Sequence, residues 1–138
     1  MIDKLKDFCK QNIVDFADVL AMLENECHVL HFDENGFLVS NKNRTYCNLH
    51  AKNIESASEI ISLIPLSTSL ICAHEDFYEN LLTNRFNVKD ITRCYQYTYV
   101  KKEPVATKNG EGFEIKLIAE NDLDLFLAII KEQTISST

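Results

Sequence analysis

The spacing of apolar residues is that of helices at the start of the chain and becomes that of strands after Glu24. In residues 2–9 and 13–23 apolar side chains recur every three or four positions, which predicts two short helices. Residues 27–49 carry short apolar runs separated by two polar turns, and the Asn35-Gly36 pair suits the positive φ of a tight hairpin. This stretch predicts a three-stranded antiparallel meander.

Helical spacing returns in residues 54–64, where Asn53 is the predicted N-cap and Pro65 the stop. Residues 70–73 form a short apolar run with polar neighbours, as a buried central strand does. Residues 75–84 then predict a second helix. The sequence therefore predicts an α/β (α+β) fold in which helices flank a mixed, mostly antiparallel sheet.

The most regular alternation in the chain runs from Asp90 to Lys101 and predicts a long strand. Tyr95, Tyr97 and Tyr99 would share one face of it. Three amphipathic rings in a row could line a groove for an acyl chain, a ring or a partner strand. Tyrosines on a strand are also ordinary cross-strand packing, so both interpretations stay open.

A composition change after this strand predicts a domain boundary. Residues 104–112 have no apolar period and contain one proline and two glycines, which is typical of a linker. Residues 1–103 form the first predicted domain. Residues 113–138 read as one strand and one helix, and an exposed apolar face on them would favour self-association or pairing with another chain.

Composition limits the classes of function. With 138 residues, 46% of them hydrophobic, the chain suits one ordinary core. A net charge of −7 repels phosphate backbones, so we expect no nucleic-acid partner. The longest apolar runs fall far short of the roughly 20 residues that cross a bilayer, so we expect no membrane partner. The N-terminus mixes both charge signs, unlike a secretory signal, and predicts a cytoplasmic protein.

The sequence favours no metal site. The five cysteines are scattered singly, which predicts reduced, buried thiols. Cys27, His28, His31 and Asp33 lie close in sequence, but on a strand His28 and His31 would point to opposite faces. His74 is a separate candidate for a substrate or partner face, because a strand ends there and a helix follows. The alternative is that the acidic residues after it only complement the helix dipole.

The order of elements resembles a known fold. A meander, a helix, a central strand, a second helix ending in Asn84-Arg85-Phe86 and a long strand resemble the C-terminal half of the GNAT-type N-acetyltransferase fold over about Cys27 to Lys101. Residues Phe113 to Asp124 look like the opening strand and first helix of a second such domain. The resemblance implies a tandem GNAT-like protein whose second domain is only begun here.

The residues that carry chemistry in that family differ in this chain. The family's pyrophosphate loop is glycine-rich, whereas the matching residues 50–55 contain no glycine and end in an acid. The family's general-acid tyrosine matches Leu81, which cannot donate a proton. A glycine usual before Phe86 is Arg85 here.

We therefore expect a non-catalytic, GNAT-like N-terminal domain with a structural or positioning role, no catalytic residues and no cofactor of its own. Its expected partner is a catalytic GNAT domain or a second copy of the chain. The first alternative is an acyl-CoA-binding or small-molecule-binding N-acetyltransferase that holds acetyl-CoA in an atypical cleft. The second is an interaction module that uses the tyrosine face.

Overall fold

A computed structural model describes residues 1–98, 103 and 119–136 of the chain. The chain divides into two units, Met1–Val100 and Lys101–Thr138, and each is described by itself. The predicted linker 104–112 and the predicted strand 113–118 lie outside the described residues.

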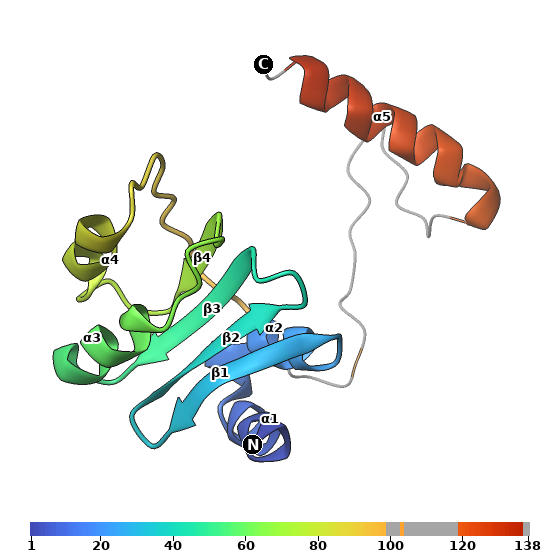
Figure 1. The fold of residues 1–138 in the computed structure, drawn as a ribbon. Coiled ribbons are helices and arrows are strands. Elements are labelled where there is room, and N and C mark those ends of the chain that lie inside the picture. The colour runs from blue at the N-terminus through green and yellow to red at the C-terminus, as the bar shows by residue number, and fades with distance from the viewer. Residues whose placement is uncertain (99–102, 104–118, 137–138) are drawn as a thin grey trace. The chain divides into compact units, whose positions relative to one another are not determined.

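The first unit is a mixed sheet flanked by helices, which confirms the predicted α+β class (Figure 1). Its elements follow the chain in the order α1 (Ile2–Gln11), α2 (Ile13–Leu23), β1 (Cys27–Asp33), β2 (Gly36–Asn41), β3 (Tyr46–Ala51), α3 (Ile54–Ser62), β4 (Leu70–Ala73) and α4 (Glu79–Arg85).

The sheet has the order β1-β2-β3-β4. Its first three strands form the predicted antiparallel meander, and β4 joins β3 in parallel after the crossover through α3. In the register, Val39 pairs with Asn48 and Asn48 with Cys72. Side chains at these paired positions lie on the same face of the sheet, because paired residues in neighbouring strands point the same way.

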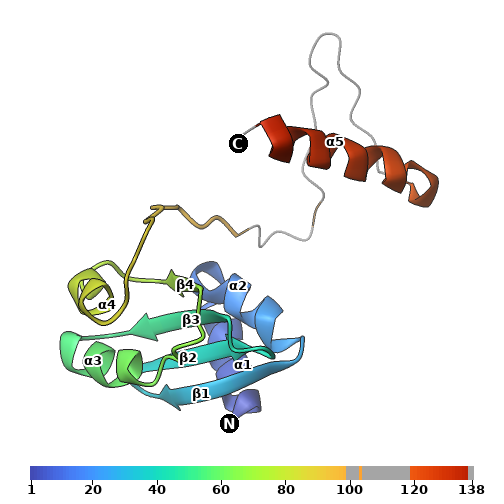
Figure 2. The ribbon, with the colours of Figure 1, turned by 45° about the horizontal axis from the view of Figure 1, so that its top comes forward.

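Helices cover both faces of the sheet (Figure 2). Phe37 and Val39 of β2 pack with α1 and α2, whereas Leu38 between them packs with α3. The strand is thus buried on both sides, and its alternate residues enter two separate cores. Tyr78 enters the α3 core, whereas its neighbour Phe77 is 46% exposed.

The two turns of the meander differ from the expectation. Gly36 does not adopt a positive φ, and it is already the first residue of β2. Asp33 Oδ1 closes the first turn by accepting the N–H groups of Asn35 at 2.7 Å and Gly36 at 3.1 Å. The positive φ lies in the second turn, at Arg44. A side-chain turn by aspartate therefore replaces the predicted glycine turn.

The predicted strand from Asp90 to Lys101 is wrong over its described residues, since 90–98 have no strand structure. Tyr95 and Tyr97 are 89% and 90% exposed, while Tyr99 lies outside the described residues. Alternation produces a strand only when one face is buried, and the four-residue β4 offers a short edge for pairing.

The second unit contains a short 3-10 turn, Glu120–Asp122, and helix α5, Leu123–Ser136. Helix α5 lies within residues 113–138, for which the sequence predicts one strand and one helix. Large apolar side chains on it are exposed: Leu123, Leu125, Phe126, Leu127 and Ile129. Within the described parts of the chain, no helix combines the length and apolar character that a bilayer crossing requires.

Candidate functional site

Alternate residues of β3 and β4 form a row of polar side chains on one face of the sheet. Tyr46, Asn48 and His50 share this face of β3, and the apolar residues between them face α3. Cys72 of β4 and His74, which follows β4, continue the row on the neighbouring strand. Helix α2 covers the row, so these polar groups lie between the sheet and a helix.

Asp18 of α2 is the centre of this polar cluster. Its Oδ2 atom accepts a hydrogen bond from Asn48 Nδ2 at 3.1 Å, and it lies 3.2 Å from His74 Nε2 and 3.8 Å from Cys72 Sγ. His74 Nε2 is also 2.7 Å from Asn48 Oδ1, and Asn48 Nδ2 donates to Tyr46 Oη at 3.3 Å. The other carboxylate oxygen, Oδ1, is buried and has no hydrogen-bond partner among the described residues.

Asp18 is the acidic group of this cluster, and a thiol and a phenol lie beside it. Burial raises the pKa of Asp18, but hydrogen bonds from His74 and Asn48 outweigh it and bring this pKa to about 2. Burial and the charge of Asp18 raise the pKa of Cys72. Burial also raises the pKa of Tyr46 to about 12. At neutral pH the thiol and the phenol are therefore protonated, and Cys72 is not an activated nucleophile.

Glu75 forms a second polar cluster at the carboxyl end of β3. Its Oε2 atom is 2.7 Å from His50 Nδ1, and its Oε1 atom accepts the N–H of Ala51 at 2.9 Å. The hydroxyl of Tyr78 lies 3.0 Å from Oε1 and 3.4 Å from the carbonyl oxygen of Leu49. Burial opposes ionisation of Glu75, but these hydrogen bonds together hold its pKa below the ordinary value.

Aromatic rings hold both imidazoles in place. The ring of His50 lies 4.8 Å from that of Phe16 and 5.3 Å from that of Phe37, between centroids. The ring of His74 lies 5.1 Å from Phe16. Each histidine thus has one carboxylate partner and an apolar wall, which fixes its ring orientation.

The candidate residues from the sequence have different surroundings. His74 lies in the Asp18 cluster, whereas Tyr95 and Tyr97 are exposed. The acidic residue after His74 does more than complement a helix dipole, because Glu75 binds Ala51 and His50 before α4 begins.

Sequence reasoning missed Asp18, Asn48 and His50. One signal for the last two was available, since Tyr46, Asn48 and His50 alternate with apolar Cys47 and Leu49. No local pattern marks Asp18, because it is 30 positions from Asn48 in the chain.

The cysteines are all free, but only part of the prediction of buried thiols is correct. Cys9 and Cys47 are buried, Cys27 and Cys72 are partly buried, and Cys94 is exposed. On β1, His28 Nε2 lies 3.2 Å from the carbonyl oxygen of Lys42, and His31 pairs with Asp33 at 3.1 Å.

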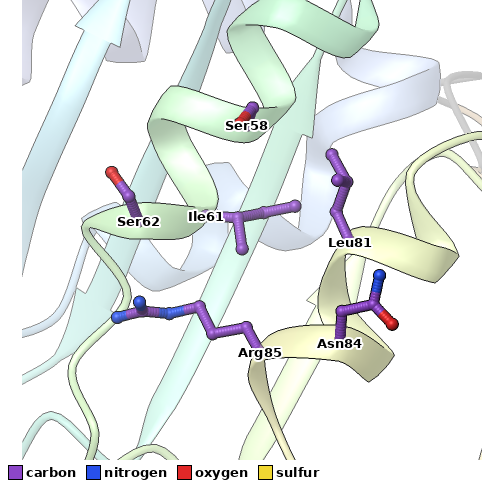
Figure 3. A pocket seen from close by; sticks show the side chains of 6 residues that line it. All are labelled: Ser58, Ile61, Ser62, Leu81, Asn84 and Arg85. Atoms are coloured by element: carbon purple, nitrogen blue, oxygen red, sulfur yellow. The ribbon is translucent and has the colours of Figure 1, made fainter.

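A shallow hollow of about 270 Å³ lies between α3 and α4 (Figure 3). Leu81, at the position matched to the family's tyrosine, points toward Ile61 across it. Arg85 Nη2 donates to the carbonyl oxygen of Ile64 at 3.0 Å, so its guanidinium already has a partner. The hollow is lined by alkyl groups, neutral polar groups and the guanidinium of Arg85, none of which exchanges a proton readily at neutral pH.

The low pKa of Asp18 predicts a stability contribution that acid removes. Because the folded-state value, about 2, lies below the ordinary 3.8, the contribution is present above pH 3.8 and is lost as the pH falls toward 2. The partly exposed carboxylate limits it to about 2 kcal/mol. Asp18→Asn should therefore be less stable than the original chain at pH 7, and the difference in their free energies of unfolding should vanish near pH 2. Urea unfolding at several pH values measures this difference. Asp15→Asn, on the exposed side of α2, is the control, and equal pH profiles for the two variants would contradict the prediction.

Comparison with family models, with curated proteins and with solved structures gave no match. The class that fold and site define is thus a mixed α+β domain with a polar cluster between its sheet and α2.

Proposed function

We propose that the Met1–Val100 unit is a non-catalytic, GNAT-like domain that positions a catalytic acetyltransferase domain. The order meander, α3, β4, α4 matches the resemblance up to α4, whereas the long strand that the resemblance places next is absent from residues 90–98. One observation supports the non-catalytic part of the proposal: the parallel strands β3 and β4 stay hydrogen-bonded up to their carboxyl ends.

An acyl-CoA arm would need these two strands to separate near Leu49 and Ala73. They stay paired there, and the N–H of His74 extends the ladder by donating to the carbonyl oxygen of Leu49 at 3.1 Å. The next amide along β3, that of Ala51, donates its hydrogen to the carboxylate of Glu75. A carboxylate on this amide leaves no donor for the arm and repels the phosphates of the cofactor.

The N-terminus of α3 is also occupied by its own residues. The side chain of Asn53 accepts the N–H of Ser56 at 2.8 Å, so the predicted N-cap is confirmed. Glu55 follows in the first turn. A pyrophosphate site at a helix start needs free amides and a close backbone approach. The capped, acidic turn supports a role without a cofactor.

Helix α5 supports the positioning role. Leu125 and Leu127 are 66% and 52% exposed, and Phe126 between them is 40% exposed, so apolar residues emerge on several sides of the helix. Such a helix is stable only inside a larger core. We assign that core to the acetyltransferase domain whose first helix α5 resembles.

The proposal predicts that the chain does not bind acetyl-CoA, and calorimetric titration of the 138-residue protein tests this. We expect no heat of binding at millimolar ligand, because Glu75 closes the strand ends. Micromolar binding would contradict the non-catalytic role and favour the acyl-CoA-binding alternative. In that case Glu75→Ala should change the affinity and Glu59→Ala, exposed on α3, should not.

A further inference from the structure

Three side chains with metal-binding atoms converge in the Asp18 cluster. Asp18 comes from α2, Cys72 from β4 and His74 from the residue after β4. One ligand atom from each lies within 4.8 Å of the other two. Among the residues that the structure describes, no other three His, Cys, Asp or Glu side chains converge in this way.

Two of the three distances in this group resemble the edges of a tetrahedral metal site, and the third is within 4.8 Å. With the usual zinc bond lengths, a nitrogen–oxygen edge is about 3.3 Å and a sulfur–oxygen edge about 3.5 Å. His74 Nε2 and Asp18 Oδ2 are 3.2 Å apart, and Cys72 Sγ and Asp18 Oδ2 are 3.8 Å apart. An ion can therefore be placed among the three atoms with small side-chain movements.

The hydrogen bonding of Asp18 is uneven in the absence of an ion. Three neighbouring groups crowd Oδ2, while Oδ1 is buried without a partner among the described residues. Buried carboxylate oxygens normally have a partner, and Oδ1 is an acceptor that the neighbouring side chains leave unused. A cation between the three side chains would take the place of the crowded hydrogen bonds at Oδ2, and Asn48 would still orient Asp18 through its amide.

We propose that Asp18, Cys72 and His74 bind a divalent transition-metal ion of the zinc type. A carboxylate, a thiolate and a neutral imidazole are ligands that zinc prefers, and three protein ligands leave one position for water or for Asn48 Oδ1. On binding, Cys72 releases its proton to solvent and His74 binds through the lone pair of Nε2. The two negative ligands then balance the charge of the ion. The site lies on the α2 face of the sheet and is independent of the proposed positioning role.

Cobalt titration of the metal-stripped 138-residue chain tests the site, because tetrahedral Co²⁺ absorbs in the visible and a thiolate ligand adds a charge-transfer band. We expect both signals to saturate at one ion per chain and to disappear when Zn²⁺ is added. Cys72→Ser should remove the charge-transfer band, and His74→Gln and Asp18→Asn should weaken binding by roughly 100-fold or more.

Two matched variants serve as controls on the far edge of the sheet. Cys27→Ser changes another half-buried thiol, and His31→Gln changes another imidazole paired with an aspartate. Both should bind Co²⁺ as the original chain does. Circular dichroism of every variant separates loss of the site from loss of the fold, and Asp18→Asn, the smallest change, is used if the others unfold. Absent saturation, or equal effects of the Cys27 and Cys72 variants, would overturn the proposal.

Discussion

Gly36→Ala is expected to destabilise the fold by more than about 3 kcal/mol, the largest single effect we predict. A Cβ at this position would overlap the carbonyl oxygen of His50 and would lie 2.8 Å from Ile60 Cδ1 and 3.1 Å from Ala51 Cα. The carbonyl belongs to the backbone of β3, so it cannot move without disturbing the β2–β3 ladder. Urea unfolding of the purified variant measures the loss.

Glu34→Ala is the control for this substitution, because Glu34 lies in the same turn with its side chain exposed. It should change the free energy of unfolding by no more than about 0.5 kcal/mol. Gly36 has no positive φ, so backbone strain would not explain a large loss of stability in Gly36→Ala. The cause would be the steric clash of the new Cβ with β3 and α3. Equal stabilities of the two variants would mean that the strands do not approach this closely.

Glu75→Ala is expected to cost about 2 to 4 kcal/mol of stability. The carboxylate accepts the amide N–H of Ala51 and the hydroxyl of Tyr78, and it pairs with His50. Its removal leaves buried groups of Ala51 and Tyr78 without this partner. Glu75→Gln keeps an acceptor for the amide and should cost less. Asp76→Ala, at the exposed neighbouring position, should change little.

The pH dependence of the Glu75 variants gives a second measurement. The folded-state pKa of Glu75 is lowered, so its contribution is present above the ordinary pKa of 4.5 and is lost as the pH falls below that value. The deficit of Glu75→Gln relative to the original chain should therefore shrink in acid. A deficit that stays constant from pH 7 to pH 3 would show that the His50 pair does not depend on the charge.

Local signals predicted most elements of the first unit. Asn53 caps α3 as its position before the apolar period indicates, and the meander follows from polar turns between short apolar runs. The tyrosine alternation predicted a strand wrongly, because Tyr95 and Tyr97 have the pattern of a strand but no surface that buries one face. An alternating pattern forms a strand only where another part of the fold buries one of its faces.

The Asp18 cluster was harder to predict from the sequence than the fold. Cys72 and Asp18 are 54 positions apart, and neither belongs to a motif with metal-ligand spacing. From the sequence, Glu75 was interpreted as an acid that complements a helix dipole. Only the tertiary structure shows that it lies beside the end of β3 and binds the amide of Ala51. Such contacts depend on which strands are neighbours, and this information is not local.

The sequence by itself determined where this chain forms helices and most of its strands, because spacing, caps and turns act over a few residues. It also determined that residues 50–55 lack the glycines of a phosphate loop. The tertiary structure alone decided that α2 lies over β3 and β4 and brings Asp18 to His74 and Cys72. The physical reason is that burial, unlike helix or strand spacing, is a property of surfaces that meet only after the chain has folded.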